Sequence, residues 1–127
     1  MELFRVFAQI FPWYLLTVLI ETPVLLIGLA RRHSLKRRLF AGIWLTACTY
    51  PGVNIVIPYL LSGAPDIVQA VTEETFAPLA ECLLFWLAFR APDYVPREMW
   101  RDFAAIIAAN LTSFALGEII KIAIRTG

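Results

Sequence analysis

The stretch that decides the fold is residues 6–30, with the sequence VFAQIFPWYLLTVLIETPVLLIGLA. Its only charged side chain is Glu21, and it is long enough to cross a hydrocarbon core of about 30 Å, which takes roughly 20 residues of helix. Three further stretches meet the same criterion, at residues 39–61, 67–89 and 103–124. Of these, 67–89 is the least certain, because its strongly apolar part begins only at Phe76. The sequence therefore predicts an all-α chain with four transmembrane helices.

The composition of the chain agrees with a membrane location. Of its 127 residues, 60% are hydrophobic and 17% are charged, whereas a soluble domain is nearer half apolar and a quarter charged. A chain this short exposes too much of its surface to hide so many apolar side chains from water. The net charge of +1 gives no reason to expect a nucleic-acid partner. We therefore expect a single transmembrane domain over residues 1–127, surrounded by a lipid bilayer and without a cofactor.

Basic residues are unevenly distributed over the predicted connections. Eight of the 11 Lys and Arg residues lie in the first connection, residues 31–38, and the third, residues 90–102. The second connection, residues 62–66, has none. The positive-inside rule then places the first and third connections in the cytoplasm and both termini on the other side of the membrane. Because the connections are short, consecutive helices should be antiparallel neighbours, which predicts an antiparallel four-helix bundle.

The first connection carries a second expectation. Its basic residues form a candidate site for anionic lipid: Arg31, Arg32, Lys36, Arg37 and Arg38. His33 lies among them and is expected to be solvated. Both expectations follow from the high positive charge of this segment alone.

Polar side chains lie inside the predicted spans at a common depth. Counted from the cytoplasmic end of each span, six of them are about seven to ten residues in, which is roughly 10–15 Å at 1.5 Å per residue. These six are Glu21, Thr46, Thr49, Glu81, Asn110 and Ser113, and Asn54 extends the set outward. Their spacings are those of inward-facing helical stripes. The sequence therefore predicts that these seven residues form a polar layer near mid-membrane that binds a substrate or an ion.

Two carboxylates in this layer are difficult to explain by packing alone. A carboxylate at the bilayer centre costs at least about 2.5–3.5 kcal/mol on insertion scales, and no Lys or Arg lies at the depth of Glu21 and Glu81. Each carboxylate is then protonated, solvated in a polar cavity or bound to a cation. The alternative is structural: a protonated glutamic acid donates to a carbonyl freed by Pro23, Pro51 or Pro78, and the hydroxyl and amide groups only join helices, at about 0.6 kcal/mol each.

Residues around the layer carry narrower expectations. Gly117 continues the polar stripe of the fourth span and is expected at a close helix contact. Glu73 and Glu74 are expected at the outer interface, and Glu118 is expected to pair with Lys121 at i+3.

Motifs of membrane enzymes are not found in the sequence. It contains no His-Glu-x-x-His and no Gly-x-Ser-x-Gly, and no metal can be assigned. Whether the chain is an enzyme stays open, with a non-enzymatic function favoured.

Several short motifs form an ordered set along the chain: Glu21-Thr22-Pro23, Thr49-Tyr50-Pro51 with Asn54, Glu81, and residues 110–117, NLTSFALG. This set resembles a group of small bacterial four-helix membrane proteins with Glu-x-Pro, Thr-His-Pro and Asn-x-x-Ser-Phe-x-x-Gly patterns. The resemblance implies a bacterial inner-membrane location and implies no mechanism. Tyr50 stands where the group has histidine, which removes a ligating side chain from that position.

These observations favour a small integral membrane protein whose polar layer binds a proton, a hard cation or a small polar solute during transport. Oxygen ligands without sulfur or imidazole suit such cations better than zinc or copper. Because the chain is small for a transporter, we expect a homo-oligomer or a subunit of a membrane complex. The alternative is a non-catalytic accessory or scaffold subunit of a larger membrane complex, whose polar layer serves helix packing.

Overall fold

The computed structural model describes residues 2–126, and these residues are helical over most of their length and form no strand. The elements are α1 (Glu2–Gly28), α2 (Leu35–Pro51), the π-helix η1 (Gly52–Val56), α3 (Ile57–Leu60), α4 (Asp66–Phe89) and α5 (Pro96–Thr126). The predicted all-α class is therefore confirmed.

Three helical stretches are long and apolar enough to cross a membrane: Ala8–Gly28, Leu35–Leu60 and Pro96–Thr126. They match three of the four predicted spans and, by their length and composition, indicate a membrane protein. The fourth predicted span, 67–89, coincides with α4, which is 24 residues long. By composition alone α4 does not qualify as a membrane span, because it contains three glutamates, Glu73, Glu74 and Glu81.

The helices extend past the predicted span ends. α5 begins at Pro96 instead of residue 103, and α2 begins at Leu35 instead of residue 39. The start of α2 is set by Ser34, whose side chain accepts a hydrogen bond from the backbone N–H of Arg37 at 3.1 Å. Proline at the first helical position suits the start of α5, since its fixed φ matches a helix. Membrane thickness sets the minimum length of a spanning helix, whereas capping residues determine where the helix begins.

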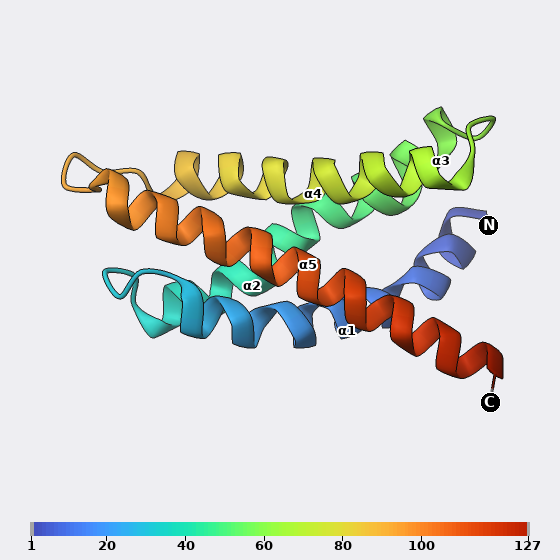
Figure 1. Cartoon of the computed structure of the whole chain (residues 1–127), viewed down its shortest axis with the longest axis horizontal. Helices are drawn as coiled ribbons and strands as arrows, with labels where there is room; N and C mark the ends of the chain where they lie inside the picture. Colours follow the sequence, from blue (N-terminus) through green and yellow to red (C-terminus); the bar gives the residue numbers. More distant parts are fainter. Residues whose placement is uncertain (1, 127) are drawn as a thin grey trace.

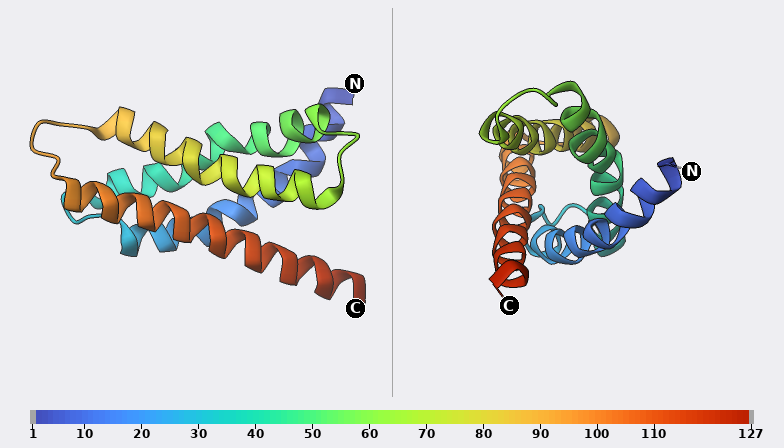
Figure 2. Two further views of the ribbon diagram at one scale, coloured as in Figure 1. Left: turned by 45° about the horizontal axis from the view of Figure 1, so that its top comes forward. Right: turned by 90° about the vertical axis from the view of Figure 1, so that its right-hand side faces the viewer.

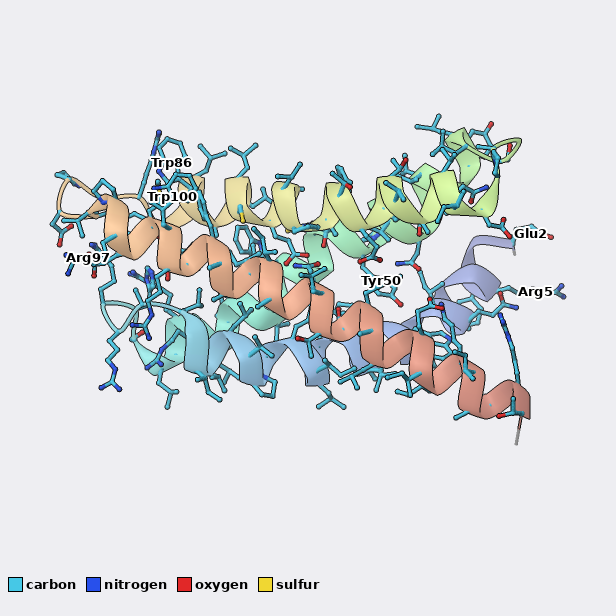
Figure 3. All side chains as sticks on the ribbon, in the orientation of Figure 1. Glu2, Arg5, Tyr50, Trp86, Arg97 and Trp100 are labelled. Atoms are coloured by element: carbon cyan, nitrogen blue, oxygen red, sulfur yellow. The ribbon has the colours of Figure 1, made fainter. Side chains whose placement is uncertain are left out.

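The four long helices lie side by side in a closed ring (Figures 1 and 2). α1 packs against α2 and α5, and α4 packs against the same two helices. The termini and the connection 61–65 lie at one end of the molecule, named the open end here. The connections 29–34 and 90–95 lie at the other end, named the basic end. Figure 3 shows Trp86, Arg97 and Trp100 near the basic end, where polar and aromatic side chains suit a membrane interface.

The apolar core occupies the half of the molecule next to the basic end. It consists of Leu25, Leu29, Ala41, Leu45, Cys82, Phe85, Ala105, Ile106 and Ala109, contributed by all four long helices. Towards the open end, α1 and α5 diverge from each other (Figure 2). The molecule is therefore tightly packed in one half and widens in the other.

Two glycines permit the close helix contacts of the packed half. A Cβ atom added at Gly42 would lie 3.1 Å from the Cα of Thr22 on α1. A Cβ atom added at Gly28 would lie 2.8 Å from the Cβ of Ala105 on α5. The expectation of such a contact at Gly117 is wrong, because a Cβ atom there would meet nothing within 4 Å. The reason is that the helices are far apart at the level of Gly117. The local sequence does not predict that distance.

The contact at Gly42 gives a first prediction. Gly42→Ala should destabilise the folded chain by about 1–3 kcal/mol, because the added methyl group meets backbone that no side-chain rotation can move. Gly63→Ala is the matched control, since a Cβ atom at Gly63 meets nothing within 4 Å. Thermal melts of the two purified variants in detergent measure the difference. Equal melting temperatures would contradict the α1–α2 contact.

Candidate functional site

Side-chain hydrogen bonds join the four long helices near the middle of their length. On α1, Glu21 Oε2 accepts from the hydroxyl of Ser113 on α5 at 2.6 Å. On α4, Glu81 Oε2 accepts from the hydroxyl of Thr49 on α2 at 2.9 Å, and Glu81 Oε1 accepts from Asn110 Nδ2 on α5 at 3.2 Å. The Ser113 hydroxyl also lies 3.0 Å from the carbonyl oxygen of Asn110, so the two carboxylates are linked through α5. The structure thus brings together five of the seven predicted site residues in one network.

The two carboxylates differ in how they are satisfied. Each is only 2% exposed, and neither forms an ion pair within residues 2–126. Both oxygens of Glu81 accept a hydrogen bond, whereas Glu21 Oε1 is buried and has no partner in the described part of the chain. An unsatisfied buried polar atom costs roughly 1–3 kcal/mol. Glu21 Oε1 is therefore the atom of the network with unused capacity to bind a proton or a cation.

The other two predicted site residues lie beside the network. The hydroxyl of Thr46, which is buried, donates to the carbonyl oxygen of Gly42 at 3.0 Å. Asn54 is exposed and donates to the carbonyl oxygen of Tyr50 at 3.0 Å. Both line the same cavity as the carboxylates. Thr46 and Asn54 thus belong to the cavity wall, and Thr46 lies next to Glu21 while its hydroxyl donates to Gly42.

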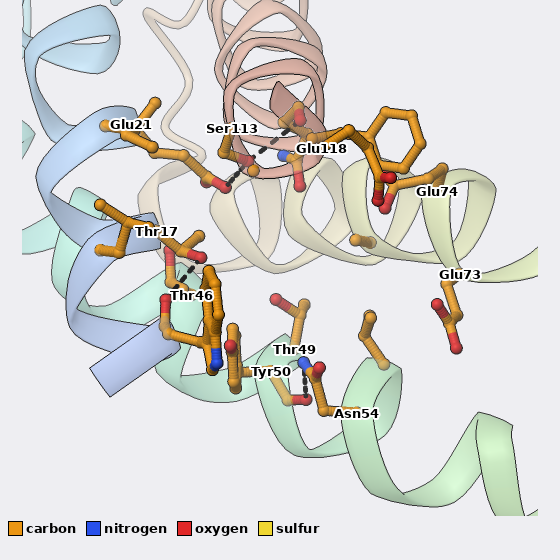
Figure 4. Close-up of a pocket in the computed structure, with 18 of the residues that line it drawn as sticks. Thr17, Glu21, Thr46, Thr49, Tyr50, Asn54, Glu73, Glu74, Ser113 and Glu118 are labelled. Atoms are coloured by element: carbon orange, nitrogen blue, oxygen red, sulfur yellow. Dashed lines mark hydrogen bonds between the residues drawn. The ribbon is translucent and has the colours of Figure 1, made fainter. Parts of the chain in front are cut away.

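A cavity of about 310 Å³ extends from the network towards the open end (Figure 4). All four long helices and η1 contribute to its wall. Its polar lining beyond the network consists of Thr17, Thr46, Tyr50, Asn54, Glu73, Glu74, Glu118 and Lys121. Figure 4 shows Glu21, Thr49 and Glu74 reaching from three different helices towards this shared space.

The π-helix forms part of the cavity wall. The second span is interrupted after Pro51, and η1 follows directly at Gly52. Proline removes one backbone N–H from the helical ladder, and a π-turn is a common way for a helix to accommodate such a gap. Val53 and Asn54, both within η1, line the cavity. The irregular turn therefore lies where it widens the space around the network.

Three more carboxyl groups surround the outer part of the cavity. Glu73 and Glu74 are half-buried and line it. The predicted pair of Glu118 with Lys121 is confirmed, with Nζ 3.6 Å from Oε1. The same ammonium lies 5.9 Å from the ring centre of Trp13 on α1. With Glu21 and Glu81 included, five carboxyl groups and one ammonium line the cavity, an arrangement that attracts cations.

A metal site is not evident in this arrangement. Within residues 2–126, no three His, Cys, Asp or Glu side chains lie close enough to hold a metal ion. Cys82 is buried in the apolar core and Cys48 is exposed, so the two thiols are not placed for a shared ligand. The polar side chains that line the cavity can instead form ionic and hydrogen-bonding contacts.

A second polar cluster, which the sequence did not predict, closes the basic end. Asp102 is fully buried, and its Oδ1 accepts from the backbone N–H of Ala30 at 2.7 Å. Its Oδ2 accepts from His33 Nε2 at 2.7 Å and from the hydroxyl of Tyr94. Arg37 lies 3.3 Å from His33 Nδ1, and because a guanidinium only donates, the imidazole proton is on Nε2. The expectation that His33 is solvated is wrong, because Asp102 offers it a buried acceptor.

Ionic contacts hold the third connection against the first. The guanidinium of Arg32 lies 3.0 Å from Asp93 and 3.3 Å from Glu98, and 4.8 Å from the ring centre of Tyr94. The hydrogen bond from Arg32 lowers the pKa of the Asp93 carboxyl. Burial and the adjacent Asp102 carboxylate raise the pKa of Tyr94, so its hydroxyl keeps the proton that it donates to Asp102. The basic first connection therefore has a structural use of its own, in addition to the orientation expected from its charge.

The predicted lipid-binding residues divide into two groups. Arg32 and Arg37 contact the clusters just described, and Arg38 donates to the carbonyl oxygen of Leu26 at 2.6 Å. Arg31, Lys36 and also Arg37 are exposed, whereas Arg32 and Arg38 are half-buried. The part of this segment that is placed to meet a lipid headgroup is smaller than its charge suggests.

The buried acceptor at the basic end gives a second prediction. Asp102→Asn should destabilise the folded chain by roughly 1–3 kcal/mol for each donor left unsatisfied, because an amide cannot accept from His33, Tyr94 and Ala30 together. Asp93→Asn is the control, since the Asp93 side chain is 81% exposed. Melting temperatures in detergent compare the two. A loss for Asp102→Asn no larger than that for Asp93→Asn would contradict the role of the cluster.

Comparisons of the chain with protein-family models, with curated proteins and with solved structures gave no match. None of them bears on the resemblance to the small bacterial four-helix proteins, which stays a prediction. The functional interpretation of the cavity therefore rests on its geometry.

Proposed function

We propose that this chain is a transport protein of the bacterial inner membrane that binds a cation or a proton in the cavity between its helices. One observation carries this proposal: Glu21, 2% exposed, has an oxygen without a partner within residues 2–126, and it lies at the inner end of a carboxyl-rich cavity. A bound proton or cation offsets the cost of burying that oxygen. No basic side chain of the described part of the chain forms an ion pair with it.

In this proposal α4 is the fourth transmembrane helix of an antiparallel bundle. At 1.5 Å per residue, its 24 residues span about 36 Å, which exceeds the hydrocarbon thickness. Glu73, Glu74 and Glu81, which lower its mean hydropathy, all line the cavity, where they avoid lipid. The distribution of basic residues then puts the basic end in the cytoplasm and the open end on the other side.

This orientation gives a third prediction. Reporter fusions at Ser34 and Pro92 should score as cytoplasmic, and fusions at Gly63 and after the C-terminal residue should score as non-cytoplasmic. A reversed pattern would overturn the orientation. Equal sidedness of the Gly63 and Pro92 fusions would show that α4 does not cross the membrane.

Access from one side supports a transport cycle. The cavity reaches from Glu21 towards the open end, while the apolar core and the Asp102 cluster fill the half next to the basic end. A ligand that enters from the open end therefore meets the buried carboxylates before a packed barrier. Release on the other side requires the packed half to separate, as alternating access demands. A chain of this size would carry out such a movement as a homo-oligomer.

The fourth prediction tests the carboxylates. Glu21→Gln and Glu81→Gln keep the size of each side chain and remove its charge, so the bundle should stay folded. Glu21→Gln should lose the dependence of its melting temperature on pH and on added cation that the parent shows, because the carboxylate with the unpartnered oxygen is removed. Glu81→Gln should keep that dependence and melt at a lower temperature, because an amide cannot accept from both Thr49 and Asn110. Asp66→Asn, in which an exposed carboxylate outside the cavity is changed, should respond like the parent. If Glu21→Gln melts at or above the parent temperature with the parent's ion response, the network is structural only.

A second candidate function is that of an accessory subunit of a larger membrane complex. It is favoured by the hydrogen bonds that join the four long helices. The contacts of Glu81 with Thr49 and Asn110 need no ligand, because hydrogen bonds of this kind commonly hold transmembrane helices together. The exposed Arg31 and Lys36 would then meet anionic lipid. The proteins that copurify from native membranes separate the two candidates, since a stoichiometric partner would favour the subunit.

A further inference from the structure

We infer that the ligand of the cavity is a protonated organic amine with an apolar body, a conclusion that rests on the proposed function and narrows its substrate class. The juxtaposition that carries it is a buried carboxylate oxygen without a partner at the inner end and aromatic rings along the wall. Each feature matches one part of such a ligand. The ammonium N–H groups donate to Glu21 Oε1, and the apolar body contacts the rings.

The size of the cavity suits an organic ligand. Its volume of about 310 Å³ lies at the lower end of the roughly 300–1,000 Å³ that is typical of small-molecule pockets. A bare divalent metal ion instead needs several oxygen ligands at about 2.0–2.6 Å. Within residues 2–126, no three acidic, His or Cys side chains converge to that extent. The cavity therefore offers more volume and fewer convergent ligands than a bare metal ion requires.

The wall supplies the apolar and aromatic contacts. Trp13 and Tyr50 line the cavity beside aliphatic side chains that include Leu16, Ile20 and Val53. The face of an aromatic ring attracts an ammonium group, and the attraction grows when the pair is removed from water. Figure 3 shows Tyr50 directed into the space between the helices. This lining can contact both parts of a ligand that carries a positive charge and an apolar part about the size of an aromatic ring.

The chain itself shows this mode of recognition at the mouth of the cavity. The ammonium of Lys121 lies 5.9 Å from the ring centre of Trp13 and 3.6 Å from the carboxylate of Glu118. An aromatic face and a carboxylate thus already hold one primary ammonium there. Tyr50 and Glu21 line the same cavity, and Glu21 Oε1 has no cation beside it in the described part of the chain.

The fifth prediction uses 2-phenylethylammonium as the probe and 2-phenylethanol as its uncharged control of similar shape. Titration of the purified protein at neutral pH, followed by its melting temperature and by calorimetry, should show saturable stabilisation by the ammonium compound only. Sodium chloride at equal ionic strength and calcium chloride are the inorganic comparisons. Stabilisation by 2-phenylethanol to the same extent would overturn the inference, because the cavity would then select shape without charge.

Variants locate the binding. Trp13→Leu should raise the dissociation constant for 2-phenylethylammonium about tenfold, through the loss of an aromatic contact with the apolar body of the ligand. Gly117→Leu should do so as well, because the added side chain projects into open cavity space, yet it should leave the response to pH unchanged. Trp100→Leu is the control for the tryptophan change, since Trp100 lies outside the cavity and is 63% exposed. If neither Trp13→Leu nor Gly117→Leu weakens binding, the amine does not occupy this cavity.

The two levels of the proposal fail separately. If sodium, calcium or protons shift the melting temperature through Glu21 while 2-phenylethylammonium does not, the amine is excluded and the transport proposal stands. If Glu21→Gln changes the response to none of these cations, the proposed function is overturned together with the inference.

Discussion

Two buried carboxylates near the middle of the long helices constrain the whole arrangement of helices. A buried carboxylate is tolerated only where donors or a counter-charge reach it, and the donors for Glu21 and Glu81 come from other helices. Ser113 and Asn110 fix α5 against α1 and α4, and Thr49 fixes α2 against α4. A shift of any of these helices by one residue would break the set. A few polar contacts thus specify the register of the helices in the ring. Apolar residues on the outer surface specify the register only weakly, because their contacts do not depend on exact alignment.

The same constraint explains why the two halves of the molecule differ. Next to the basic end, small residues such as Gly42 let the helices approach closely, and the buried Asp102 ties both connections together. Towards the open end, the carboxyl groups of Glu73, Glu74 and Glu118 need room and polar surroundings, which close packing of apolar side chains would deny them. The helices separate there, and the cavity that results is lined by the groups that require it.

The polar network could be predicted from the sequence because helix geometry is regular. A fixed rise per residue converts position into depth, which is why Glu21, Glu81 and Asn110 could be assigned to one level before their contacts were known. Two features could not be predicted. His33 and Asp102 are separated by 69 positions and meet only through the path of the connections, and the surroundings of Gly117 depend on how far the helices diverge. Depth follows from local geometry, whereas separation between helices is a property of the complete fold.

The sequence treats the two carboxylates as equivalent, and the structure distinguishes them. A proton or an ammonium added at Glu81 would compete with the donors Thr49 and Asn110, so binding there breaks contacts that hold helices together. At Glu21, Oε1 is buried and accepts nothing from the described residues, so a proton or ligand bound there would leave the hydrogen bond from Ser113 to Oε2 in place. Glu81 is therefore suited to hold the bundle in register and Glu21 to exchange a ligand. A packing role and a binding role do not exclude each other here, because each falls to a different carboxylate.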